Sequence, residues 1–216
     1  MTPFFFFYQE LESLSAFLLA AIVLAITPGP GIAYVVARTV VGGRAEGVAS
    51  TLGTAIGGLL HVAAAAFGLS LLIAQSAFAF SLLKYVGAAY LVYLGVRLLM
   101  RKDPAAAAPT VRAQGAGRAL RDGVVVELFN VKTALFFLAF LPQFVTAGEP
   151  VAPQLVLLGT ICVTLNTLVD VVAVFAADRL LRSGTARAAR AKWLTKTSGA
   201  LMIGLGGFLA LARRQA

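Results

Sequence analysis

The stretch Ala25-Ile26-Thr27-Pro28-Gly29-Pro30-Gly31-Ile32 decides the fold, because it places two prolines and two glycines inside a long apolar segment. Proline removes a backbone N–H and glycine weakens a helix, so a helix breaks here. Within a bilayer, broken backbone is tolerated only where it is buried in protein or lines a polar cavity, and secondary transporters build substrate sites from such breaks. The predicted substrate-site residues of this stretch are Thr27, Pro28, Gly29, Pro30 and Gly31.

The composition predicts an integral membrane protein. Of the 216 residues, 60% are hydrophobic and 12% are charged, whereas soluble domains carry about 25% charged residues. The net charge of +9 would suit nucleic acid, but the basic residues fall in short gaps between apolar segments, where anionic lipid headgroups are the better partner. Cys162 and His61 are the only residues of their kinds. We therefore predict no nucleic-acid partner, no metal site, no cofactor and no enzymatic activity.

Six apolar segments are long enough to cross a bilayer, which takes about 17 to 25 residues of helix. These segments are Leu14–Ala37, Val48–Ile73, Phe78–Met100, Gly123–Val145, Pro153–Ala177 and Leu194–Ala212. We predict one all-α transmembrane domain over residues 1–216, with three-helix halves at 1–100 and 122–216 joined by a linker at 101–121. The break in the first segment leaves open that it is re-entrant.

The basic residues predict the orientation. Most of the 18 Lys and Arg residues lie in the first, third and fifth loops, while the opposite side has only Arg213 and Arg214. Cytoplasmic loops carry an excess of Lys and Arg. We therefore expect the odd-numbered loops in the cytoplasm and both termini outside.

A weak internal repeat relates the two halves. Lys84-x-x-Gly87-Ala88 recurs as Lys196-x-x-Gly199-Ala200, and the same offset takes Pro30 to Pro142. Because each half has an odd number of segments, such a repeat is inverted in the membrane, as in many secondary transporters. The alternative is that two helices rich in Gly and Ala match by chance.

The fourth segment carries Glu127, Asn130 and Lys132. An ionisable side chain inside the membrane is a functional-site hypothesis by default. In the functional interpretation, Lys132 holds a substrate carboxylate and Glu127 handles a proton or an ammonium group. In the alternative, Glu127 lies close enough to Arg121 to extend to the headgroups.

Two further ionisable residues are candidates for proton coupling. Asp170 lies four residues after Asn166 within the fifth segment, and is either a proton carrier or half of an interhelical pair with Lys84 or Lys132. His61 titrates near neutral pH in its ordinary state, but a lone polar group on an Ala-rich helix often makes only an interhelical hydrogen bond. Before it, Gly53-x-x-x-Gly57 is an arrangement suited to close helix packing.

With these residues in place, the chain resembles the LysE/RhtB family of amino-acid exporters. The likeness rests on Leu24-Ala25-Ile26-Thr27-Pro28-Gly29-Pro30, Gly42-Gly43-Arg44-Ala45, Leu83-Lys84-Tyr85-Val86-Gly87-Ala88, Phe140-Leu141-Pro142-Gln143-Phe144 and Ser198-Gly199-Ala200-Leu201. The resemblance implies export of amino acids or their derivatives from the bacterial cytoplasm, through the inner membrane, in exchange for protons. It also implies a central site at Thr27 to Pro30 with Asn130 and Lys132. A homo-oligomer is left open.

Three positions depart from the family pattern. Asn130-Val131-Lys132 stands where the family usually has Asn-Pro-Lys, so a break in the fourth segment is less strongly indicated. Gly31 and Glu127 each stand where the family often has Asn. The negative charge of Glu127 favours a basic or amine-bearing substrate. The alternative functions are export of another small solute or a metal cation, and a membrane scaffold that transports nothing.

Overall fold

The computed structural model describes residues 3–69, 77–100, 112–146, 148–181, 196–197, 200, 203–207 and 209–211. Within these residues the chain forms helices and no strand, which confirms the all-α prediction. Part of the sixth predicted span, the first part of the linker, and Arg213 and Arg214 lie outside the described residues.

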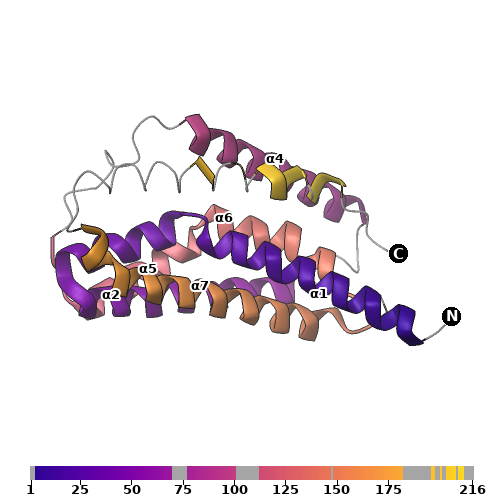
Figure 1. The fold of residues 1–216 in the computed structure, drawn as a ribbon. Helices are drawn as coiled ribbons and strands as arrows, with labels where there is room; N and C mark the ends of the chain where they lie inside the picture. The colour runs from indigo at the N-terminus through magenta and orange to yellow at the C-terminus, as the bar shows by residue number, and fades with distance from the viewer. Residues whose placement is uncertain are drawn as a thin grey trace.

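The first two helices are separated by the predicted break. α1 (Pro3–Ile26) ends at Thr27, whose N–H bonds back to Val23 O and Leu24 O. α2 (Pro30–Ala64) begins after Gly29, with Pro30 in its first turn. Proline suits that position because the first N–H groups of a helix have no partner within the helix. The break between α1 and α2 is therefore made by the residues that the sequence singled out (Figure 1).

α2 folds back on itself at Gly43, which has a φ of 71°. A straight helix would put residues 39 and 47 about 12 Å apart. Instead, a Cβ on Gly47 would lie 3.1 Å from Thr39 Cβ. α2 thus has a first arm from Pro30 to the turn and a second arm from the turn to Ala64, and the π-helix η1 (Ala65–Leu69) continues the second arm.

The second half of the chain also contains an interrupted helix. α4 (Ala77–Met100) is followed by α5 (Ala116–Leu128) and α6 (Val131–Leu135). The chain bends by 45° between α5 and α6. It then continues through the π-helix η3 (Phe136–Phe140) and the 3-10 helix η4 (Leu141–Phe144) to α7 (Val151–Leu181).

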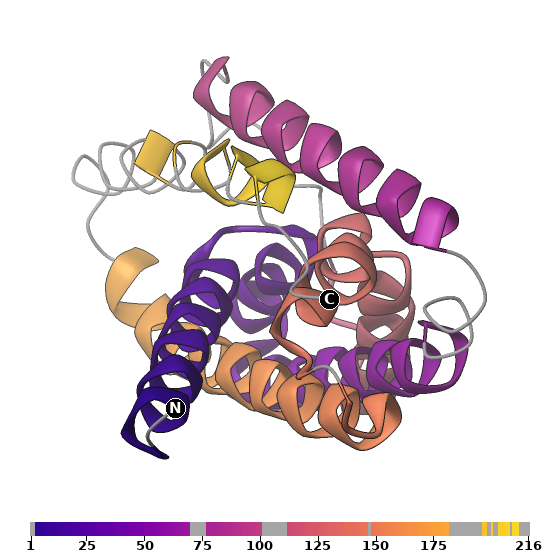
Figure 2. The same ribbon diagram turned by 90° about the vertical axis from the view of Figure 1, so that its right-hand side faces the viewer.

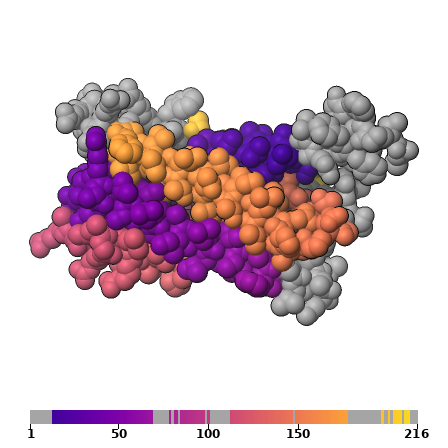
Figure 3. All heavy atoms as spheres, turned by 90° about the horizontal axis from the view of Figure 1, so that it is seen from below, coloured from indigo at the N-terminus to yellow at the C-terminus, as the bar shows by residue number. Residues whose placement is uncertain are grey.

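Glycines allow α2 to pack closely on α5. A Cβ on Gly53 would collide with the Leu120 carbonyl oxygen, and a Cβ on Gly57 would lie 2.7 Å from Glu127 Cβ. This confirms the packing predicted for Gly53-x-x-x-Gly57. α2 also packs along α7, and Figure 3 shows α7 running diagonally across one face between α1 and α2.

Aromatic rings fill the core beyond the α5–α6 bend. Phe136 and Phe140 of η3 stack with ring centroids 4.9 Å apart, and Phe144 meets Phe17 of α1 at 5.5 Å. On the other side of the core, α4 and the helical residues 203–207 and 209–211 lie together (Figure 2). A Cβ on Gly206 would lie 2.8 Å from Ala88 O, so these two segments are in close contact.

Two helical stretches of the described residues are long and apolar enough to cross a membrane, Pro30–Gly68 and Val151–Ala177. The bent pair Ala116–Leu128 and Val131–Phe144 makes a third if it is one span. The first five predicted spans all fall mainly on helical residues of the structure.

Candidate functional site

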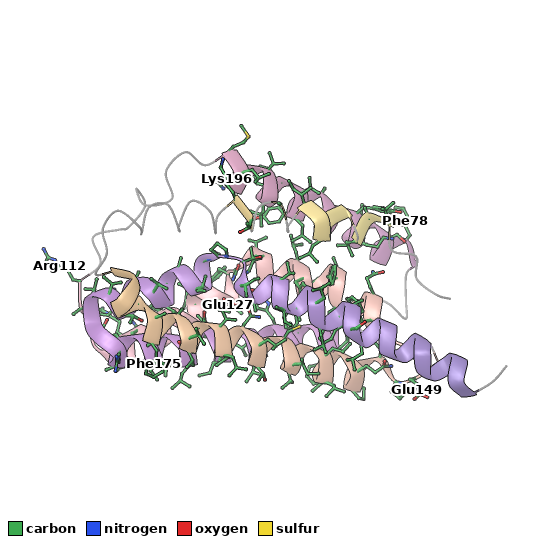
Figure 4. All side chains as sticks on the ribbon, viewed as in Figure 1. Phe78, Arg112, Glu127, Glu149, Phe175 and Lys196 are labelled. Carbon is green, nitrogen blue, oxygen red and sulfur yellow. The ribbon has the colours of Figure 1, made fainter. Side chains whose placement is uncertain are left out.

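A small cavity lies where the two breaks meet. Its volume is about 30 Å³, room for about two water molecules. In Figure 4, Glu127 lies in the middle of the bundle, whereas Arg112 and Glu149 lie at opposite ends. The polar residues that line the cavity come from α2, α5, α6, α7 and the break before α6; they are Thr54, Glu127, Asn130, Lys132, Thr133, Asn166, Thr167 and Asp170.

Lys132 joins the two breaks. Its buried Nζ donates hydrogen bonds to Leu24 O and Thr27 O, each at 3.0 Å. These carbonyls belong to the last turn of α1, which carries the negative end of the helix dipole. A Cβ on Gly29 would lie 3.1 Å from Lys132 Cε, so glycine leaves room for the lysine stem. Lys132 of α6 therefore caps the C-terminal end of α1.

Glu127 lies inside the cavity and does not extend to the headgroups, since only 8% of its surface is exposed. Asn130 Nδ2 donates to its Oε2 at 3.0 Å, and Thr133 Oγ1 donates to its Oε1 at 2.6 Å. A Cβ on Gly31 would lie 2.6 Å from Oε2. The carboxylate is therefore fixed on both oxygens and lies against the first turn of α2.

Asn130 breaks the second helix without a proline. Its φ of −75° and ψ of 96° are extended, and its side chain accepts a hydrogen bond from Lys132 N at 3.2 Å. This is the N-cap geometry in which an Asn side chain satisfies a backbone donor at a helix start. The break that the missing proline left in doubt is present.

Asp170 is buried, and its nearest hydrogen-bond partner is a hydroxyl. Thr54 Oγ1 lies 3.0 Å from Asp170 Oδ2 and 2.9 Å from Thr51 O, so its single proton can serve either acceptor. In the described part of the chain, Asp170 forms no ion pair with Lys132 or any other base.

His61 makes the interhelical hydrogen bond that the alternative interpretation expected. Its Nε2 lies 3.0 Å from Glu127 O, and its ring packs beside Phe137. A carbonyl oxygen only accepts, so Nε2 carries the proton. His61 thus caps the C-terminal end of α5.

Sequence reasoning did not identify Thr54 and Thr133, which hydrogen-bond to the two carboxylates. It also missed a second polar cluster at the turn of α2. There Glu46 Oε1 accepts hydrogen bonds from Gln114 N and Gly115 N, each at 2.7 Å, and Arg38 Nη1 donates to Glu46 Oε2 at 3.2 Å. The sequence offered one signal for this cluster, because Glu46 is the single acid in a first loop that otherwise carries the bases Arg38 and Arg44.

Helices whose broken ends meet at a buried polar cavity characterise membrane transporters. The family of LysE type translocators matches residues 22–213, and the chain belongs to that family. The family resemblance inferred from the motifs is thereby confirmed. The family is a transporter family, which implies a small-molecule substrate and a lipid bilayer around this chain.

Three similar proteins cover most of the chain, and two of them carry efflux names. An uncharacterized membrane protein of Vibrio cholerae is 31% identical over 71% of this chain and 75% of its own length. The homoserine/homoserine lactone efflux protein of Salmonella typhimurium is 29% identical over 92% of this chain and 96% of its own. The threonine efflux protein of Salmonella typhi is 30% identical over 89% and 94%. No solved structure matches.

Proposed function

We propose that this chain exports amino acids or amino-acid derivatives from the bacterial cytoplasm across the inner membrane, in exchange for protons. The observation that carries the proposal is the meeting of two broken helices at a buried cavity that holds Glu127, Lys132 and Asp170. Buried ionisable groups of this kind mark substrate and proton pathways. The names of the homoserine and threonine efflux relatives support the substrate class.

The proposal includes six spans in an inverted repeat, with halves at 1–100 and 122–216. α1 and the first arm of α2 form the first span, and the second arm forms the next. The repeat offset takes Pro30 at the first break to Pro142 in the irregular turns η3 and η4. Arg38 and Arg112 lie together at the turn of α2, and the positive-inside rule puts that end in the cytoplasm.

The proposed substrate site consists of the residues that build the two breaks and the base between them. These are Thr27, Pro28, Gly29, Pro30, Gly31, Asn130 and Lys132.

Among the proton-coupling candidates, Asp170 is the strongest. Both oxygens of Glu127 accept hydrogen bonds, and His61 is engaged by a carbonyl. Asp170 has one exchangeable hydroxyl partner.

The cavity implies an alternating cycle. An amino acid has roughly the bulk of several water molecules, and the cavity has room for about two. We therefore propose that the helices on either side of the two breaks separate to admit substrate. Glu46 links the turn of α2 to the start of α5 through Gln114 N and Gly115 N.

Efflux from cells tests the function. Cells that express the chain are loaded with mixed amino acids, and the medium is followed by mass spectrometry with and without an uncoupler. We expect one or a few compounds to appear selectively and to disappear with the uncoupler. Asp170→Asn should abolish this efflux or remove its dependence on the proton gradient, while Glu149→Gln, at an exposed site, leaves it unchanged.

A membrane scaffold predicts efflux equal to that of an empty vector, with the protein verified in the membrane. A metal-cation exporter predicts metal efflux instead. In the described part of the chain, no group of three or more His, Cys, Asp or Glu residues is arranged to hold a metal ion.

A further inference from the structure

The cavity contains more acid than base. In the part of the chain that the structure describes, Lys132 is the only base that lines it, whereas Glu127 and Asp170 both do. The ammonium of Lys132 already binds two carbonyl oxygens at the end of α1. Neither carboxylate forms an ion pair with any described base. The charge balance therefore favours a ligand that brings a positive charge.

The helix end beside the cavity, which would suit a ligand carboxylate, is already occupied by an acid of the protein. The first turn of α2 presents unpaired N–H groups and the positive end of a helix dipole, both of which favour an anion. The carboxylate of Glu127 lies against this turn, as the 2.6 Å between its Oε2 and a Cβ on Gly31 shows. A substrate carboxylate would have to share the helix end with Glu127, and adjacent like charges are strongly unfavourable.

Building on the proposed export function, we propose that the preferred substrate is an amine cation without a free carboxylate. This class comprises amides, esters and lactones of amino acids, and simple primary amines. The substrate ammonium binds between Glu127 and Asp170 and balances their charge. Glu127 takes the position at the α2 end that the carboxylate of a free amino acid needs.

A matched set of probes tests the proposal on the full-length protein in liposomes. L-threonine carries both charges, L-threoninamide only the ammonium, and N-acetyl-L-threonine only the carboxylate; a leucine set varies the side chain. Counterflow of each labelled probe is measured against the same unlabelled probe inside. We expect the amide to exchange at least about tenfold faster than the free amino acid, and the N-acetyl compound not to exchange.

The outcomes separate the two proposals. Exchange of the free amino acid as fast as its amide, or exchange of the N-acetyl compound, overturns this inference and leaves the export function standing. No exchange of any probe in either set overturns both. The wild-type ratio decides the question without any variant.

The variant Glu127→Gln tests whether the negative charge of Glu127 causes the preference for the amide over the free amino acid. Glutamine keeps the size and one acceptor for Asn130 or Thr133, but removes the negative charge beside the α2 end. We expect the ratio of amide to free amino acid to fall at least about tenfold. Glu149→Gln removes an exposed acid at the end of the bundle and should leave the ratio unchanged. An unaltered ratio in inserted, exchange-competent Glu127→Gln overturns the role of Glu127.

Discussion

The two helix breaks meet at one cavity, yet they are made by different chemistry. Between α1 and α2, Pro28 and Pro30 lack the N–H groups that a continuous helix needs, so the backbone has no alternative. Between α5 and α6, every residue has its N–H, and the side chain of Asn130 competes for the donor of Lys132. The first break is therefore fixed by covalent structure, whereas the second depends on a hydrogen bond that one substitution removes.

The breaks are also capped differently, and each by a residue from another helix. Lys132 of α6 caps the carbonyls that end α1, and His61 of α2 caps the carbonyl that ends α5. The first cap is a charged group with two acceptors, and the second is a single hydrogen bond. We therefore expect the first break to be the more costly one to disturb.

The largest effect should follow from removing both prolines of the first break. Pro28→Ala with Pro30→Ala restores two N–H donors and allows the helix to continue through the break, which takes Leu24 O and Thr27 O away from Lys132. Because small misplacements of binding groups can reduce rates by about 100-fold, we expect export to fall by about that factor while the protein still inserts. Efflux from cells measures it.

Pro153→Ala is the matched control, since Pro153 lies in the first turn of α7, away from the cavity. It should export at the wild-type rate. Wild-type export by the double variant would show that the break is not required for transport.

Lys132→Met should give the next largest effect. Methionine keeps the apolar stem but leaves the buried carbonyls of Leu24 and Thr27 without their cap. The loss should reduce the free energy of unfolding by about 3 kcal/mol, the upper range for hydrogen bonds to charged groups. Unfolding of the purified protein in mixed micelles, followed by circular dichroism, measures the change.

Arg121→Gln is the control for this comparison. Arg121 is 71% exposed and lies 3.7 Å from Asp122, and exposed ion pairs contribute little. Its change should stay within about 0.5 kcal/mol. If Lys132→Met unfolds like this control, the lysine does not hold the first break.

We expect an effect of intermediate size from substitutions of Asn130, which makes the second break. Asn130→Ala removes both the cap of α6 and the hydrogen bond to Glu127, and should reduce the free energy of unfolding by about 2 kcal/mol. Asn130→Ser keeps a cap but cannot reach Glu127, so it should recover about half of that loss. Equal losses in the two variants, measured by the same unfolding assay, would mean that the cap does not hold the break.

The difference between the breaks also explains what could be predicted from the sequence. The first break could be predicted from the sequence, because Pro28 and Pro30 cannot donate helix hydrogen bonds and Gly29 weakens the helix between them. The second break was harder to predict, because it depends on whether Lys132 N donates to the Asn130 side chain or to a backbone carbonyl, and the surrounding packing decides between them. The hydrogen bond between Thr54 and Asp170 spans 116 residues, and that between Lys132 and Leu24 spans 108. Local patterns carry no information on such pairs, since helix packing brings them together.

The smallest effect is expected from making the second break resemble the first. Val131 is the first residue of α6, where the N–H has no partner within the helix and proline is well tolerated. The ψ of 96° at Asn130 is in the extended region, close to what a residue before proline adopts.

Val131→Pro should therefore change the free energy of unfolding by no more than about 1 kcal/mol, and toward greater stability, because proline restricts the unfolded chain. In the Asn130→Ala background, the same proline should restore part of the lost stability, since it breaks the helix without the Asn cap. A proline that destabilises both backgrounds would show that the helix is continuous at Val131. It would also show that a proline cannot replace the Asn130 cap in making the second break.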